Sequence, residues 1–144
     1  MQSFGSPSGL RIVGAWTQAG FQSCVHVKGS KNEDFLFDCG VCESETLSAH
    51  HVFVTHGHVD HIGACVMHAR AKSLRGKPAT YYVPVETVVS LQQALSAFEA
   101  LDGSSINMPI VGVSPGKAKI VHFKSSLWLI HFNFPKWMKA IQSE

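Results

Sequence analysis

The stretch THGHVDH, residues 55–61, decides how the rest of the sequence is interpreted, because it places three histidines and one aspartate within one short segment. Four of the chain's nine histidines lie between residues 50 and 58, and His61 follows closely. An ordinary surface loop has no need of so many potential ligands at such short spacing. The β-prone run HHVFVTH leads into the stretch and a helical pattern follows it, so the sequence predicts a metal-binding loop between a strand and a helix.

The expected geometry of this loop divides its side chains into two pairs. His56 and His58 are two residues apart and can point the same way from an extended segment. Asp60, which we expect to cap the helix, and His61 then lie in the turn and the first helical turn. Four side chains so placed cannot comfortably enclose one ion, so we predict two neighbouring metals. Imidazole and carboxylate with open positions suit catalytic zinc, with iron and manganese as alternatives.

The composition is that of one folded domain. The chain has 144 residues, of which 45% are hydrophobic and 15% charged, and its formal net charge of +2 is too small to identify a nucleic-acid binder. No basic and apolar N-terminal segment indicates secretion, and the late apolar run SLWLIHFNF is too short to span a bilayer. We therefore expect an intracellular protein without a membrane partner, cytoplasmic, with nucleus or organelle as alternatives.

The pattern along the chain predicts an α/β layered fold. Two β-prone segments around TQAG predict a hairpin, and DFLFDCG and HHVFVTH predict two further strands. The sequence then alternates between helical and β patterns, with helices expected over 60–73 and 85–102 and strands over 79–84, 108–113 and 117–123. In the second helix an apolar face is expected from Val85, Val88, Leu91, Leu95, Phe98 and Leu101.

These motifs resemble a known family. FVTHGHVDHIGA is similar to the HxHxDH signature of the metallo-β-lactamase superfamily, and the downstream segment YYVPVETVVSLQQALSAFEALDGS narrows the resemblance to short-form ribonuclease Z. The resemblance covers residues 10–121 and implies the N-terminal half of an αββα sandwich. It also implies a zinc endoribonuclease that removes the 3′ trailer of precursor tRNA by hydrolysing a phosphodiester.

The resemblance assigns a role to each matching residue. His56 and His58 would bind a first zinc ion, and Asp60 and His61 would bind a second. Asp60 would also be the catalytic general base that takes a proton from the attacking water. Asp38, in FLFDCG, matches an aspartate that orients the metal-binding loop through hydrogen bonds.

The family pattern extends beyond the part that this chain matches. Residues 1–9 form a loose N-terminus, residues 10–121 a partial metallo-β-lactamase domain, and residues 122–144 a divergent tail. The family completes its two-zinc site with downstream ligands, but no aspartate follows Asp102 and the tail lacks the pattern. His122 is more simply a packed strand residue than a replacement ligand. The chain is therefore expected to be truncated and to hold two zinc ions, one or none.

The expected truncation leaves alternatives to an active ribonuclease Z. One is a catalytically inactive isoform that associates with full-length subunits, and a homodimer or a pairing with a full-length homologue is the expected assembly. Another is a different hydrolase of the superfamily that acts on small esters or thioesters.

Two other features have simpler explanations. Cys39 and Cys42 form a C-x-x-C motif, which admits a redox site or a zinc site with His50 and His51, but two ordinary thiols are the favoured interpretation. The basic run AKSLRGKP, residues 71–78, could contact RNA phosphates or be a solvated helix end.

Overall fold

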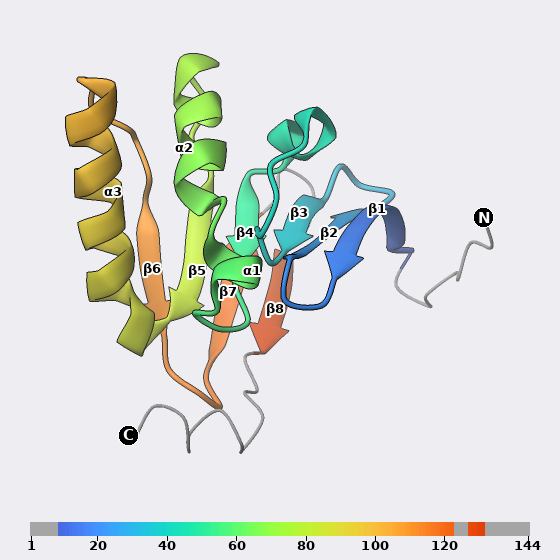
Figure 1. Ribbon diagram of the computed structural model, residues 1–144. Coiled ribbons are helices and arrows are strands. Elements are labelled where there is room, and N and C mark those ends of the chain that lie inside the picture. The colour runs from blue at the N-terminus through green and yellow to red at the C-terminus, as the bar shows by residue number, and fades with distance from the viewer. Residues whose placement is uncertain (1–8, 123–126, 132–144) are drawn as a thin grey trace.

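The computed structural model describes residues 9–122 and 127–131. Its larger sheet has six strands that follow one another in chain order (Figure 1). The strands are β1 (Arg11–Gln18), β2 (Gln22–Lys28), β3 (Asp34–Phe37), β4 (His51–Phe53), β5 (Thr80–Pro84) and β6 (Ile110–Val113). β1, β2 and β3 pair antiparallel, whereas β3 to β6 pair parallel. The predicted hairpin and α/β layering are confirmed.

Helices connect the parallel strands and cover one face of the sheet (Figure 1). They are α1 (Val59–Ile62), α2 (Cys65–Leu74) and α3 (Val88–Asp102), and the short 3₁₀ helices are η1 (Ser44–Ser48) and η2 (Val85–Thr87). α3 ends at Gly103, whose φ of 71° is the left-handed conformation that glycine adopts without a Cβ penalty. No helix in the described residues is long and apolar enough to cross a membrane.

Alternation along the strands builds two apolar layers, one on each side of the sheet. Leu36, Val52 and Tyr81 belong to the layer beneath the helices. Their neighbours Phe35, Phe53 and Tyr82 form the opposite layer, together with Val27 and Val113. Every member of this second layer is less than 10% exposed. The centre of this second layer is therefore covered, as is the centre of the first.

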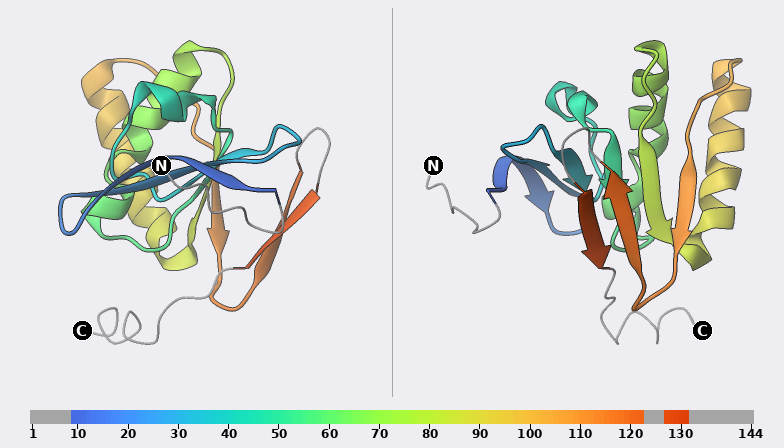
Figure 2. Two further views of the ribbon diagram at one scale, coloured as in Figure 1. Left: turned by 90° about the vertical axis from the view of Figure 1, so that its right-hand side faces the viewer. Right: turned by 180° about the vertical axis from the view of Figure 1, so that it is seen from behind.

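A second, two-stranded sheet lies on the side of the main sheet opposite α2 and α3 (Figure 2). Its strands β7 (Ala118–His122) and β8 (Leu127–His131) pair antiparallel. The sequence predicts β7 but gives no placement for residues 127–131, so β8 is a structural finding. Residues 1–8, 123–126 and 132–144, which include most of the predicted tail, lie outside the described residues.

Apolar exposure is concentrated on the helices instead. α3 forms as predicted, yet of its expected apolar face only Leu91 is fully buried. Phe98 is 50% exposed and Leu101 83% exposed. The predicted helix is present, but much of its apolar face is exposed.

Candidate metal centre

The candidate metal loop, residues 55–61, begins just after β4 and ends in α1. Its neighbour in space is Asp38, which directly follows β3. Because β3 and β4 are parallel and Phe37 pairs with Phe53, the residues after both strands meet at the same edge of the sheet. The amide of Asp38 donates to the carbonyl oxygen of Phe53 at 2.8 Å, which fixes this meeting point.

The carboxylate of Asp38 holds the loop from beneath. It is 6% exposed, and its Oδ1 accepts hydrogen bonds from the Thr55 amide at 2.7 Å and from the Thr55 hydroxyl at 2.9 Å. Its other oxygen lies 2.8 Å from Nδ1 of His61. Asp38 has a φ of 62°, a left-handed conformation that aspartate tolerates better than most residues. Asp38 therefore bonds to both ends of the loop, at Thr55 and at His61.

The three histidine rings of the loop lie together. The ring centroid of His56 is 4.5 Å from that of His58 and 4.0 Å from that of His61. Burial lowers the pKa of His56, and the adjacent rings of His61 and His58 lower it further. A lowered pKa keeps the imidazole of His56 neutral near pH 7, and neutral imidazole is the form that binds metals.

Asp60 does not cap a helix, and this prediction is wrong. α1 begins after His58, which makes no capping hydrogen bond through its side chain. The carboxylate of Asp60 instead accepts a hydrogen bond from the amide of Gly20, in the β1–β2 turn, at 3.2 Å. The same oxygen lies 3.4 Å from Nε2 of His61, so Asp60 and His61 contact each other.

The expected single helix is broken into α1 and α2 by contacts with the segment after β3. The amide of Ala64 donates to the carbonyl oxygen of Cys39 at 2.9 Å, and the amide of Cys39 donates to that of His61 at 2.7 Å. Gly40 packs directly against the backbone of Asp60, where a Cβ on residue 40 would overlap the carbonyl oxygen. The backbone of residues 39–40 therefore shapes the loop, which the sequence could have indicated only through the glycine of FLFDCG.

The donors of the loop suit a zinc ion in type, since neutral imidazole and carboxylate are its usual partners. Within the described residues, however, no three His, Cys, Asp or Glu side chains are arranged so that they could hold a metal ion together. The ring of His56 also lies nearer to that of His61 than to that of His58. The division into His56 with His58 and Asp60 with His61 therefore stays a prediction.

The cysteine motif is not a separate site in the part of the chain that is described. Cys39 is fully buried, and its pKa is raised by a hydrogen bond with Cys65 and by burial. Burial also raises the pKa of Cys42 to about 11. His50 lies 3.1 Å from Nζ of Lys72, which directs it away from a zinc shell with these thiols.

The basic run is only partly available to a phosphate. Lys72 is 2% exposed and donates to the carbonyl oxygen of Leu47 at 3.0 Å, so its ammonium group anchors η1 to α2. Arg70 forms an ion pair with Asp102 at 2.8 Å. Arg75 and Lys77 are exposed, at the end of α2 distant from the metal loop (Figure 1).

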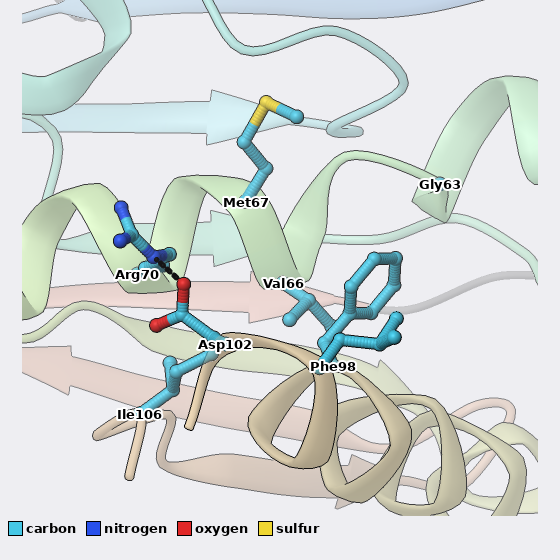
Figure 3. Close-up of a pocket in the computed structure, with 8 residues that line it drawn as sticks. Gly63, Val66, Met67, Arg70, Phe98, Asp102 and Ile106 are labelled. Atoms are coloured by element: carbon cyan, nitrogen blue, oxygen red, sulfur yellow. Dashed lines mark hydrogen bonds and ion pairs between the residues drawn. The ribbon is translucent and has the colours of Figure 1, made fainter. Parts of the chain in front are cut away.

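An apolar groove adjoins the metal loop. A pocket of about 490 Å³ begins at Gly57 and Val59 and runs between α1, α2 and α3. It continues into a second pocket, of about 260 Å³, that ends at the Arg70–Asp102 ion pair. Figure 3 shows Val66 of α2 and Phe98 of α3 facing each other in this second pocket.

Comparison with known proteins places the chain among tRNase Z relatives. The chain is 30% identical over 103 residues to tRNase Z TRZ1 of Arabidopsis thaliana, which covers 71% of this chain and 36% of that protein. It is 29% identical over 82 residues to a nuclear ribonuclease Z of Triticum aestivum, covering 56% of this chain and 47% of that protein. A chloroplastic tRNase Z, TRZ2 of Arabidopsis thaliana, is 26% identical over 99 residues, which are 68% of this chain and 27% of that protein. The chain thus spans between about a quarter and a half of the length of these relatives. No family model matches it.

Solved structures share the fold. The human short-form tRNase Z superposes with a TM-score of 0.53 at 20% identity, covering 74% of this chain and 46% of that one. The metallo-β-lactamase fold protein YhfI of Bacillus subtilis superposes with a TM-score of 0.54 at 14% identity, covering 83% and 54%. The chain is a tRNase Z-like member of the metallo-β-lactamase superfamily.

Proposed function

We propose that this chain carries the N-terminal half of a zinc-dependent endoribonuclease of the ribonuclease Z type, which hydrolyses a phosphodiester to release the 3′ trailer of precursor tRNA. The observation that supports this function is the gathering of the His56, His58 and His61 rings above the carboxylate of Asp38. Sequence matches to proteins named tRNase Z supply the reaction and the RNA substrate. The same matches cover less than half of each relative. We therefore propose that the complete activity also needs the part of those proteins that this chain does not match.

Each residue of the loop has a defined task in this function. His56 and His58 would hold one zinc ion, and Asp60 and His61 a second. Bound zinc supplies Lewis acidity, which polarises the phosphodiester and promotes deprotonation of the attacking water. Asp60 takes the proton of that water, and the Gly20 amide keeps the carboxylate turned toward His61. Asp38 keeps His61 in the orientation that leaves Nε2 available.

A second candidate function is a catalytically inactive subunit that pairs with a full-length homologue. It is favoured by one observation: within the described residues, no three donor side chains converge on a common point. A pair of donors holds an ion far more weakly than a complete shell, so a partner would have to complete the site. A homodimer or such a mixed pair is therefore our proposed assembly. A small ester or thioester as substrate has no observation in its favour.

Elemental analysis of the purified, dialysed 144-residue chain separates the two candidates. About two zinc ions per chain, with release of the 3′ trailer from a labelled precursor tRNA, support the endoribonuclease. His58→Ala should abolish that cleavage, and unchanged cleavage would assign it to a contaminating nuclease. One zinc ion or none, without cleavage, supports the inactive subunit, and co-purification with a full-length tRNase Z would then be the next measurement.

Two further inferences accompany the proposed function. The metallo-β-lactamase-like domain would extend from residue 10 to residue 121, followed by a divergent tail of unknown role. The cytoplasm would be the place of action, with the nucleus and organelles as alternatives, since the relatives include proteins named nuclear and chloroplastic. Imaging of the tagged full chain would test the location.

A further inference from the structure

We propose that Thr55 is a positioning residue that fixes the tautomer of His56, by extending the hydrogen-bond network of Asp38 to Nδ1 of the ring. We call the chain of hydrogen bonds through Asp38, Thr55 and His56 the relay. Its role in metal binding rests on the proposed function. The relay itself consists only of bonds within the protein, so it can be tested without a metal.

The hydroxyl group of Thr55 lies between the carboxylate and the ring. Oγ1 is 2.9 Å from Oδ1 and 3.1 Å from Oδ2 of Asp38, and 2.8 Å from Nδ1 of His56. The Thr55 amide donates to the same carboxylate at 2.7 Å, which fixes the threonine backbone beneath the ring. Two independent bonds to Asp38 therefore determine where the hydroxyl oxygen lies.

The direction of each hydrogen bond follows from the number of protons available. A hydroxyl group has one hydrogen, and a carboxylate can only accept. If the hydroxyl donated to His56, two oxygen atoms would face each other at 2.9 Å with no hydrogen between them. The hydroxyl therefore donates to Asp38 and accepts from the ring. His56 must then carry its proton on Nδ1, and the lone pair of Nε2 is free.

The same carboxylate controls a second ring directly. Nδ1 of His61 lies 2.8 Å from Oδ2 of Asp38, so His61 also carries a proton on Nδ1. Asp38 thus fixes the tautomers of two rings: that of His61 by direct contact, and that of His56 through Thr55. The tautomer of His58 is not fixed in this way. Within the described residues its ring contacts His56 but has no hydrogen-bond partner.

The consequence for the metal centre is preorganisation of His56. A ring that is free to exchange tautomers presents a protonated Nε2 for part of the time, and a protonated nitrogen cannot bind a metal. Groups that orient a metal-binding histidine through its other nitrogen typically contribute about 10–100-fold to metal affinity. Loss of the Thr55 hydroxyl should therefore weaken zinc binding without removing any ligand.

Nitrogen NMR on the full metal-free chain tests the relay. With ¹⁵N-labelled histidine at about pH 8, where imidazole is neutral, long-range ¹H–¹⁵N correlations report which ring nitrogen carries the proton. We expect His56 in the Nδ1–H form in the wild type. Thr55→Val keeps the side-chain shape and the backbone bond to Asp38, and should shift His56 toward the Nε2–H form. Thr55→Ser retains the hydroxyl and should restore the wild-type pattern.

Two controls separate the relay from a general loss of structure. His61 should keep its Nδ1–H form in Thr55→Val, because its bond to Asp38 does not pass through the threonine. Thr17→Val removes an exposed hydroxyl on β1, which has no hydrogen bond among the described residues, and should leave His56 unchanged. A wild-type His56 in the Nε2–H form would overturn the relay, as would an Nδ1–H form that persists in Thr55→Val.

Zinc competition against a chromophoric chelator distinguishes failure of the relay from failure of the proposed function. We expect Thr55→Val to bind zinc about 10–100-fold more weakly than the wild type, and Thr55→Ser to bind within about threefold. Equal affinity of wild type and Thr55→Val would overturn the role of the relay in metal binding. If the wild type binds no zinc while the NMR pattern is as expected, the relay is supported and the zinc chemistry is rejected.

Discussion

Replacing Gly40 with alanine is the substitution for which the structure gives the clearest expectation. A Cβ at this position would overlap the carbonyl oxygen of Asp60, and would lie 2.5 Å from its carbonyl carbon and 2.8 Å from the backbone nitrogen of Ser23. All three atoms belong to the main chain, so no side chain can rotate away to make room. Either the segment after β3 or the candidate metal loop has to move.

The cost can be worked out from the bonds that such a movement breaks. Three main-chain hydrogen bonds hold this junction: Gly40 to Ser23 at 2.9 Å, Cys39 to His61 at 2.7 Å, and Ala64 to Cys39 at 2.9 Å. At about 1 kcal/mol each, their loss lowers the free energy of unfolding by about 3 kcal/mol. That is a large part of the roughly 5–15 kcal/mol typical of a folded domain.

Gly76→Ala is the control, because it adds a methyl group where no atom would overlap it and so measures backbone strain alone. Gly76 has a φ of 70°, and no atom lies within 4 Å of the point that a Cβ would occupy, so only strain of about 1–2 kcal/mol is expected. Urea unfolding followed by circular dichroism gives both values. If Gly40→Ala destabilises the chain by no more than Gly76→Ala, the packing of Gly40 against Asp60 does not shape the loop.

Three further outcomes are expected. Tyr81→Phe should lower the free energy of unfolding by about 1–3 kcal/mol in urea titrations, because it removes the hydroxyl 2.7 Å from Nδ1 of the fully buried His68. Tyr82→Phe removes a hydroxyl that lies 3.4 Å from Nδ1 of His51 in a partly buried contact, so it should lower the free energy of unfolding by less than about 1 kcal/mol. Equal losses for the two variants would contradict this reasoning. Burial lowers the pKa of His68 in the folded chain below the 6.5 of the unfolded chain. As pH falls through 6.5, His68 is therefore protonated in the unfolded chain before the folded one, and the free energy of unfolding should decrease. His68→Gln should show a smaller decrease in its urea midpoint between about pH 7.5 and 5.5, and an identical decrease would exclude His68 as a source. Asp38→Asn tolerates the left-handed backbone but loses a charged acceptor, so zinc affinity measured by chelator competition should fall about 10–100-fold, and unchanged affinity would contradict an orienting role.

The sequence predicts most of the strands because their patterns are local. In β3 to β5, successive apolar residues face two different layers, so each strand appears in the sequence as a short continuous apolar run. The hairpin formed by β7 and β8 is harder to predict. Its second strand, Leu127–His131, pairs by contacts with β7 that no local pattern of residues 127–131 indicates.

The details of the candidate site depend on contacts between segments distant in sequence. Asp60 has the residue type and position of a helix cap, but the Gly20 amide, 40 residues earlier, binds its carboxylate instead. Thr55 reads as an ordinary strand residue until Asp38 is placed beneath it. The apolar spacing of α3 predicts the helix correctly, but it cannot show that Leu101 is exposed.

The thiols of Cys24 and Cys42 have a consequence for oxidation. Burial raises the pKa of Cys24 to about 12 and that of Cys42 to about 11. Near pH 7 both side chains are therefore protonated, whereas the thiolate is the form that reacts with oxidants. Although the sequence presents Cys42 in a C-x-x-C motif, its surroundings in the fold are those of a thiol that resists oxidation.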